Sequence, residues 1–446
     1  MSLPRYPAYK VSGVAWLGEV PGHWEVKPVK AIASCNDGVL DESTPADYEI
    51  EYVEISGVDA GRGITSTDVI PFGSAPSRAR RRVQDGDVLV STVRTYLRSI
   101  APINNPPDNM IASTGFAVVR PRMIEPHLLG YLFQAEFLIS EVIARSVGVS
   151  YPAINASDLM RLNVPIPFAE EQSAIAAFLD RETGKIDALV AEQEKLIALL
   201  KEKRQAVISH AVTKGLNPAA KMKDSGIAWL GEVPEHWEVK RLRFVAELNP
   251  SKSEIAKLDR NAEVSFLPME AVGDDGTLSL DRTRTIGEVE TGYTYFREGD
   301  VTIAKITPCF ENGKGAVMRG LIGGIGFGTT ELVVARPCEN QSTSDYLHWL
   351  FVSTPFRKLG EAAMYGAGGQ KRMPDDFVRD FSVAFPDVEE QTTIAAFLDR
   401  ETAKLDALTA EAQRGIALLK ERRSALISAA VTGKIDVQST QLLEAA

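Results

Sequence analysis

The sequence contains EEQSAIAAFLDRETGKIDALVAEQEKLIALLKEKRQAVISHAVT at Glu170–Thr213 and a second copy at Glu389–Thr432, with 31 identities in 44 positions. No proline follows Pro167 until Pro218, and none follows Pro386. Proline interrupts helices, so its absence from both blocks favours uninterrupted helix. We therefore predict two long helices, over residues 168–216 and 387–446, each about 65 Å long at 1.5 Å per residue.

The apolar residues of both blocks follow a heptad pattern. The first copy has Leu179, Ile186, Leu200 and Val207 at one heptad position, with Gln193 as a polar interruption and with Leu189 and Leu196 three residues on; the second copy repeats this with Leu398, Leu405, Leu408, Leu419 and Leu426. A 3.5-residue apolar repeat predicts a coiled-coil seam. The simplest partner for each helix is its own copy, and we expect an antiparallel pair. The alternative is that each helix packs separately on its own domain.

A second repeat precedes each helix at a distance. Ser12–Lys27 and Ser225–Lys240 are identical at 14 of 16 positions, and both contain WLGEVPxHWE. The segments between these repeats and the helices diverge strongly and share only landmarks such as Gly86-Asp87-Val88 against Gly299-Asp300-Val301. Their short Val, Ile, Tyr and Thr runs with Gly and Pro punctuation predict mixed α/β domains. The sequence thus predicts an α+β protein with a pseudo-twofold internal repeat: domains at 1–167 and 217–386, separated by the two helices.

Several local elements can be predicted inside the diverged segments. Strands are expected at Val88–Ile100, Phe116–Pro121, Val301–Ile306 and Glu331–Pro337, and helices at His127–Ser146 and Tyr346–Ala363. The residues Lys214–Asp224 are expected to connect the two halves. Four tryptophans of the WLGEVPxHWE segments, Trp16, Trp24, Trp229 and Trp237, are expected to pack where each domain meets the helices, which leaves His23 and His236 without a catalytic role.

Composition excludes several classes of protein. The 446 residues are 44% hydrophobic and 24% charged, close to the average of soluble globular proteins. Three cysteines form no CxxC pair and argue against a disulfide framework. No stretch approaches the ~20 apolar residues that a membrane span requires, so we expect a cytoplasmic protein without membrane contact. The net charge of −11 argues against a general nucleic-acid coat, although it allows a local basic face.

This duplicated arrangement resembles the specificity subunit of type I restriction–modification systems. The matching residues are Trp16–Glu25 with Trp229–Glu238, Glu170–Thr183 with Glu389–Thr402, and the closing segments Asn163–Pro167 with Ser382–Pro386. The resemblance covers essentially the whole chain. It implies that each variable half is a target-recognition domain for one part of a bipartite, asymmetric double-stranded DNA target. It also implies that the helices set the spacing and dock two modification (methyltransferase) subunits, with restriction (translocase/endonuclease) subunits as further partners.

The same resemblance implies a non-catalytic subunit with no metal and no cofactor of its own. S-adenosylmethionine, ATP and magnesium are expected on the partner subunits. The sequence itself agrees: NNPPDNM at Asn104–Met110 has Asp108 where an adenine methyltransferase would place an aromatic residue, and Gly313–Gly315 lacks the spacing of a phosphate-binding loop. The open alternatives are a coiled-coil scaffold without a DNA role and a self-contained DNA methyltransferase or nuclease.

Residues expected to contact DNA lie in basic or loop-like stretches of both variable halves. Between Phe72 and Ala101 the chain carries six arginines against Asp85 and Asp87, a local charge of +4. Arginine can form a bidentate pair with guanine, worth about 1–3 kcal/mol of discrimination, although a solvated surface run would look the same. The predicted DNA-binding residues are Arg78, Arg80, Arg81, Arg94, Tyr96, Arg98, Ser150, Tyr151, Asn155, Lys305, Thr307, Asn312, Lys314, Gln370, Lys371 and Arg372.

Overall fold

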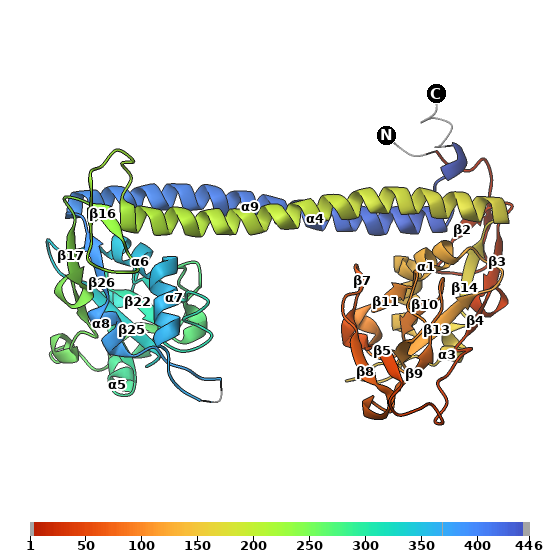
Figure 1. Cartoon of the computed structure of the whole chain (residues 1–446), viewed down its shortest axis with the longest axis horizontal. Helices are drawn as coiled ribbons and strands as arrows, with labels where there is room; N and C mark the ends of the chain where they lie inside the picture. Colours follow the sequence, from red (N-terminus) through yellow and green to blue (C-terminus); the bar gives the residue numbers. More distant parts are fainter. Residues whose placement is uncertain (1–3, 368, 440–446) are drawn as a thin grey trace. The chain divides into compact units, whose positions relative to one another are not determined.

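The computed structural model describes residues 4–367 and 369–439 (Figure 1). The chain divides into two compact units. The first contains the residues up to Glu194 together with those from Arg414 onward, and the second is Lys195–Gln413. Each unit therefore combines one variable domain with half of each long helix. Domain 1 is the part of the first unit that precedes the first long helix. Domain 2 is the part of the second unit that lies between the two long helices.

The helices are short within the domains and long in the repeated blocks. Their bounds are α1 Pro126–Gln134, α2 Glu136–Ala144, α3 Ala156–Leu159, α4 Ala169–Lys214, α5 Ile286–Val289, α6 Ser344–Val352, α7 Thr354–Ala363, α8 Asp375–Asp380 and α9 Val388–Val431. The two predicted long helices are thus α4 and α9, but α9 ends at Val431. Gly433 adopts a positive φ of 71°, which lets the chain turn out of the helix. The prediction of helix beyond Val431 was therefore wrong for the next few residues, and residues 440–446 lie outside the described part.

The strands of domain 1 form two four-stranded sheets and three pairs. The bounds are β1 Tyr9–Val11, β2 Glu19–Pro21, β3 Glu25–Pro28, β4 Ala33–Cys35, β5 Glu49–Val53, β6 Val58–Asp59, β7 Gly63–Ile64, β8 Asp68–Pro71, β9 Ala79–Arg82, β10 Val88–Ser91, β11 Ile100–Pro102, β12 Met110–Ser113, β13 Phe116–Pro121 and β14 Asn163–Ile166. The sheet orders are β11-β10-β13-β4 and β8-β5-β12-β9, and the pairs are β1-β2, β14-β3 and β6-β7.

Domain 2 repeats this topology. Its strands are β15 Met222–Asp224, β16 Glu232–Pro234, β17 Glu238–Arg241, β18 Ala246–Leu248, β19 Glu263–Leu267, β20 Thr283–Thr285, β21 Thr294–Arg297, β22 Val301–Ala304, β23 Gly315–Val317, β24 Ile325–Gly328, β25 Leu332–Pro337 and β26 Ser382–Phe385. The sheet orders β23-β22-β25-β18 and β20-β19-β24-β21 match those of domain 1 strand for strand. The parallel pair β5-β12 also has its counterpart in β19-β24. The diverged halves therefore share one fold.

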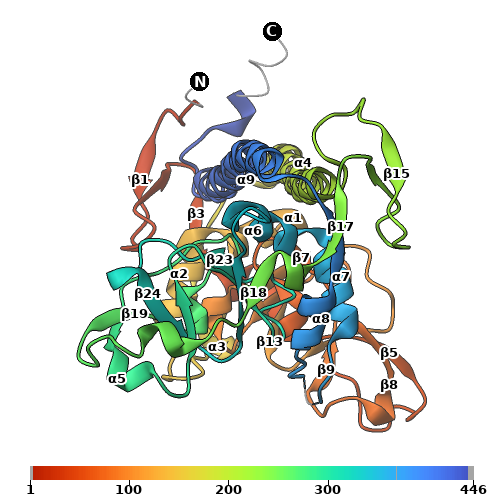
Figure 2. The ribbon, with the colours of Figure 1, turned by 90° about the vertical axis from the view of Figure 1, so that its left-hand side faces the viewer.

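Each domain packs its core directly against the helix pair. Trp24 is fully buried in a cluster that contains Leu128 of α1, Ile175 of α4 and Val431 of α9. Trp237 is fully buried in the equivalent cluster of the second unit, with Val212 of α4 and Ile394 of α9. Trp16 stacks on Phe137 and Trp229 on Phe381. The predicted packing of the four tryptophans is confirmed. Figure 2 shows α6 of the second unit beneath the helix pair.

The two helices are antiparallel within each unit. In the first unit, Asp187 of α4 pairs with Arg423 of α9 at 3.0 Å, and the N-terminal turns of α4 share a core with the C-terminal turns of α9. In the second unit, Arg204 of α4 pairs with Asp406 of α9 at 2.9 Å. The predicted antiparallel pairing is confirmed, and with it the α+β fold class. Only one of the two heptad positions predicted for the seam is correct. At the other position, Leu189, Leu196 and Leu408 are 42–54% exposed.

Three predicted elements are interrupted. The strand expected over Val88–Ile100 is β10 and β11 with a loop between them, and the two expected domain helices each break, at Ala135 and at Ser353. Both break residues have extended backbone. The connector Lys214–Asp224 ends in β15.

Candidate nucleic-acid interface

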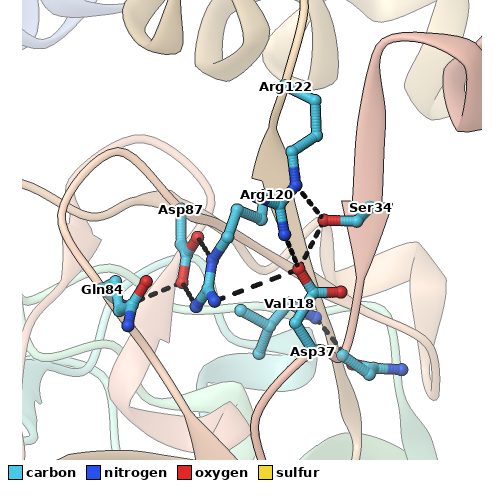
Figure 3. Close-up of polar contacts among 8 residues, drawn as sticks. Ser34, Asp37, Gln84, Asp87, Val118, Arg120 and Arg122 are labelled. Atoms are coloured by element: carbon cyan, nitrogen blue, oxygen red, sulfur yellow. Dashed lines mark hydrogen bonds and ion pairs between the residues drawn. The ribbon is translucent and has the colours of Figure 1, made fainter.

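A buried ion pair joins two strands of the sheet β11-β10-β13-β4, which we call the central sheet of domain 1 (Figure 3). The central sheet of domain 2 is its equivalent, β23-β22-β25-β18. The carboxylate of Asp87, which is fully buried at the start of β10, accepts two hydrogen bonds of 2.8 Å from Arg120 on β13. A second carboxylate, Asp37, lies 4.0 Å from Arg120 and pairs with Arg122 at 2.5 Å. The bonds to Asp87 raise the pKa of the Arg120 guanidinium. The pair thus locks the start of β10 to β13.

Domain 2 builds the same pair at its equivalent landmark. Arg336 on β25 donates to Asp300 at 2.7 and 2.8 Å. In domain 2 a second carboxylate also accepts a hydrogen bond from this arginine, because Arg336 donates to Glu254 at 2.6 Å. Burial opposes the charge on Arg336, yet Asp300 and Glu254 together raise its pKa above the ordinary value for arginine. The Gly-Asp-Val landmark therefore marks a structural ion pair in both domains.

A glutamate at the start of each long helix holds the WLGEVPxHWE segment. Glu171 accepts hydrogen bonds from Tyr6 at 2.5 Å and from Trp24 at 2.9 Å, and it lies 2.9 Å from His23. In the second unit, Glu390 accepts from Trp237 at 3.1 Å and lies 2.8 Å from His236. Both histidines thus take part in joining a domain to its helix, and neither faces a candidate reaction centre.

Two exposed loops meet beyond the end of the central sheet of domain 1. The first follows β10 and contains Arg94, and the second is the hairpin 147–153, which follows α2. They are joined by a β-bridge between Val93 and Ala153 and by a 2.8 Å bond from the Arg94 amide to the carbonyl of Pro152. The guanidinium carbon of Arg94 lies 4.8 Å from the ring centroid of Tyr151. The structure therefore brings together two residues predicted to contact DNA.

Domain 2 joins the equivalent loops in the same way. Ile306, in the loop after β22, bridges to Arg372 of the hairpin 365–372, and Tyr365 bridges to the same arginine. The Thr307 hydroxyl donates to the carbonyl of Gly369 at 2.9 Å and accepts from the Lys371 amide at 2.9 Å. Gln370 and Lys371 are exposed at the tip, and Gly368 lies outside the described residues. The two domains thus present different side chains from one loop architecture.

The other predicted residues of domain 1 are more scattered. Arg78 pairs with Glu54, Arg80 lies over Phe72, and Arg81 on β9 has a buried Nε without an acceptor among the described residues. Arg98 forms a bidentate pair with Glu136 at 2.8 and 2.9 Å. Tyr96 and Ser150 are exposed within the two loops, and Asn155 is exposed just after the hairpin 147–153. The predicted basic run therefore does not form one continuous face.

Several predicted residues of domain 2 are engaged within the domain. Lys314 donates to the carbonyls of Met269 and Val272 at 3.1 and 2.9 Å. Lys305 lies 3.3 Å from Asp375, and Arg372 pairs with Glu331 at 2.7 Å. Asn312 is exposed. Of these, Lys314 is directed into the domain and is the least suited to contact an external ligand.

One basic residue beside the loop that follows β22 was not predicted from the sequence. Arg357 on α7 is half-buried against Gly313, and its guanidinium has no ion-pair partner in the described part of the chain. Burial lowers its pKa. No sequence signal singles it out, because Arg357 lies beside Lys358 and four residues before Glu361 on an ordinary amphipathic helix.

Other kinds of site find no support among residues 4–367 and 369–439. No group of three or more His, Cys, Asp or Glu side chains there is placed to hold a metal ion. No helix in these ranges is both long and apolar enough for a bilayer crossing. The free cysteines Cys35, Cys309 and Cys338 are each partly buried.

Comparison with known proteins places this architecture. Residues 23–198 match the type I restriction modification DNA specificity domain. The Escherichia coli type I restriction enzyme EcoEI specificity subunit is 41% identical over 36% of this chain, a match that spans 27% of that relative. The putative type I restriction enzyme MjaX specificity subunit of Methanocaldococcus jannaschii is 24% identical over 95% of this chain and 96% of the relative.

A solved structure extends the likeness to the whole fold. A chain from a study of complex assembly and conformational transition of the type I R-M system superposes with a TM-score of 0.63 and 22% identity. The superposition covers 93% of this chain and 99% of that one. Domain match, full-length relatives and fold agree with the repeated sequence blocks. Residues 23–198 therefore match the DNA specificity domain of type I restriction–modification systems, and the chain is similar over 95% of its length to a specificity subunit of such a system.

Proposed function

We propose that this chain is the DNA-recognition subunit of a type I restriction–modification complex, in which each domain reads one part of a bipartite, asymmetric DNA target. The observation that carries the proposal is the pair of loops at the end of each central sheet. The same bridges hold both loop pairs, yet domain 1 presents Arg94 and Tyr151 while domain 2 presents Gln370 and Lys371. One scaffold with two different sets of exposed side chains suits the reading of two different sequences.

The helix pair is proposed to set the spacing of the two half-sites and to dock two modification subunits. Leu189 and Leu418 are exposed in the first unit, and their repeat equivalents Leu408 and Leu199 are exposed in the second. A helix that exposes leucines along its length usually covers them with a partner helix. Because the same pair of leucines is exposed in both units, two copies of one partner could dock in the same way.

The chemistry is proposed to reside on the partners. Methylation and cleavage would use S-adenosylmethionine, ATP and magnesium bound by modification and restriction subunits, and this chain would act by placing them on DNA. Cytoplasmic location follows from that role. A scaffold without a DNA role would leave the different loops of the two domains without a purpose.

The test is a selection experiment with the full chain co-purified with its modification subunit. A library of random duplexes is incubated with the complex, and the bound fraction is sequenced. We expect enrichment of one two-part sequence with a fixed gap. A matched complex in which residues 147–153 are replaced by a glycine-serine loop of equal length should lose selection in one half only. Bound duplexes with no sequence preference would overturn the proposal.

A further inference from the structure

Arg94 differs from most arginines of domain 1 in having no carboxylate partner. Arg98 and Arg120 are each held by two hydrogen bonds to one carboxylate, and Arg122 pairs with Asp37. In the described part of the chain the guanidinium of Arg94 meets only the face of Tyr151, at 4.8 Å. Its hydrogen-bond donors are therefore available to an external acceptor.

The backbone holds Arg94 in a conformation that is costly for any residue other than glycine. Its φ and ψ are 50° and 47°, in the left-handed region. Two contacts maintain this conformation: the Arg94 amide donates to Pro152 at 2.8 Å, and its carbonyl accepts from Leu97 at 2.9 Å. A strained, exposed and non-glycine residue that its neighbours hold in place is typical of functional sites. The backbone at Arg94 is thus fixed before any ligand binds.

The two joined loops that contain Arg94 and Tyr151 also carry exposed apolar side chains. Val147, Val149 and Tyr151 of the hairpin are 64–103% exposed, and Leu97 is 45% exposed. Exposed apolar side chains gathered around an unpaired arginine are unusual for a solvated surface and typical of an interface. On DNA such side chains can contact thymine methyl groups and the edges of bases. A purely phosphate-binding loop would need charge and no such apolar rim.

We infer that Arg94 reads a guanine in the half-site of domain 1 and that Tyr151 is the residue that positions it. The planar guanidinium fork matches the O6 and N7 acceptors of guanine in the major groove. Stacking on Tyr151 fixes the plane of that fork. This inference rests on the proposed DNA-reading function and names one of the bases read.

Domain 2 lacks this reader. The residue that follows the bridging Ile306 is Thr307, where domain 1 has Arg94 after the bridging Val93. The Thr307 hydroxyl is already bonded to Gly369 and Lys371. The half-site of domain 2 must therefore be read by other residues, and a guanine preference tied to this loop position belongs to one half of the target only.

The selection experiment with the complex of the full chain and its modification subunit tests the inference. Wild type should select an invariant guanine in one half-site, and Arg94→Ala should reduce the preference at that base pair by about 5- to 150-fold. Arg94→Gln should shift the preference there toward adenine, which glutamine can bind in a bidentate manner. The control is Arg161→Gln, which removes an exposed arginine paired with Asp158, and it should leave every position unchanged.

The proposed role of Tyr151 is tested by the base preference at a single base pair, because a general loss of folding would affect every position. Tyr151→Ser should weaken selection at the same base pair while the other half-site stays intact, and Tyr151→Phe should restore it because the ring remains. If the wild type selects no sequence, the proposed function fails. If the wild type selects a two-part sequence but Arg94→Ala keeps the guanine preference, only this inference fails. Loss of assembly with the modification subunit in Arg94→Ala would assign the loop to a protein partner and also overturn it.

Discussion

Domains 1 and 2 have almost the same fold and almost no common sequence between the repeated blocks. They share few polar contacts. One is a buried Asp–Arg pair between two central strands, and the other is a hydrogen bond from a tryptophan to the glutamate at the start of the long helix. What differs is the exposed loop pair, where Arg94 in one domain stands against Thr307 in the other. The comparison teaches that a few buried polar contacts and an apolar core specify this fold, which leaves the exposed loops free to diverge.

The shared ion pair is not equally supported in the two domains. Arg120 has Asp87 in contact and Asp37 only at 4.0 Å, whereas Arg336 has both Asp300 and Glu254 in contact. A buried arginine that loses its only close carboxylate is left as an uncompensated charge. The two domains should therefore respond differently when the same aspartate is removed.

The largest expected effect is that of Asp87→Asn. This change leaves Arg120 without a close carboxylate and should destabilise domain 1 by about 3–5 kcal/mol. Asp300→Asn should cost domain 2 clearly less, because Glu254 stays 2.6 Å from Arg336. Native-state hydrogen exchange, read separately for the central strands of each domain, measures both changes.

The control for this comparison is Glu136→Gln, which removes an equal charge from the exposed pair with Arg98. It should cost less than about 1 kcal/mol. If Asp300→Asn destabilises domain 2 as much as Asp87→Asn destabilises domain 1, the second carboxylate does not compensate.

A histidine found only in domain 2 should make that domain acid-sensitive. Aligning Tyr131-Leu132-Phe133 with Trp349-Leu350-Phe351 places His348 opposite Gly130. Burial lowers the pKa of His348 to about 4. Its unfolded value is near 6.5, so as pH falls below 6.5 the unfolded chain takes up a proton that the folded domain does not. Domain 2 should lose on the order of 3 kcal/mol between pH 6.5 and pH 4 from this group.

Proteolysis of urea-treated protein at neutral and acidic pH, with fragments assigned to each domain, measures this loss. His348→Gln should remove that part of the acid sensitivity from domain 2 and leave domain 1 unchanged. An unaltered difference between the domains in the variant would show that other groups cause it.

The smallest of the three effects separates the two helix starts. Glu171→Gln replaces one carboxylate oxygen with an NH2 group, so that Tyr6, which donates to Oε1, and Trp24, which donates to Oε2, can no longer both keep their acceptor. The change should destabilise the first unit by about 1.5–3 kcal/mol, the range for hydrogen bonds to charged groups. Glu390→Gln should have a smaller effect, since Glu390 has two such partners and its side chain is 29% exposed against 6% for Glu171. Thermal unfolding of both variants, compared with the exposed neighbour Glu170→Gln, tests the order.

The repeated features of the fold could be predicted from sequence, and the loops could not. Heptads and proline placement predicted α4 and α9, and the paired tryptophans predicted the cores beneath them. The common topology of the diverged domains was not predicted, because strand order depends on contacts far apart in the chain. Only short landmarks gave a signal of it: Gly86-Asp87-Val88 against Gly299-Asp300-Val301, and Val118–Pro121 against Val334–Pro337.

Two local errors have physical causes. The run Val88–Ile100 has the β-branched composition of a strand, yet Arg94 and Arg98 both adopt positive φ and break it. Neither is glycine or asparagine, so no residue preference announces the loop. The heptad leucines Leu189, Leu196 and Leu408 were predicted in the seam but are exposed, because a heptad pattern does not tell which partner covers a position. The DNA-binding residues stay a prediction.

The composition of the first unit has a consequence for synthesis on the ribosome. Ile427 and Val431 at the end of α9, with Ile435 and Val437 after it, are buried in the same cluster as Trp24 and Leu128. These four residues are translated after the whole of the second unit, every residue of which precedes Arg414. The unit that begins first is therefore completed last, and a chain that stalls after residue 413 would expose an unfinished core near its own beginning.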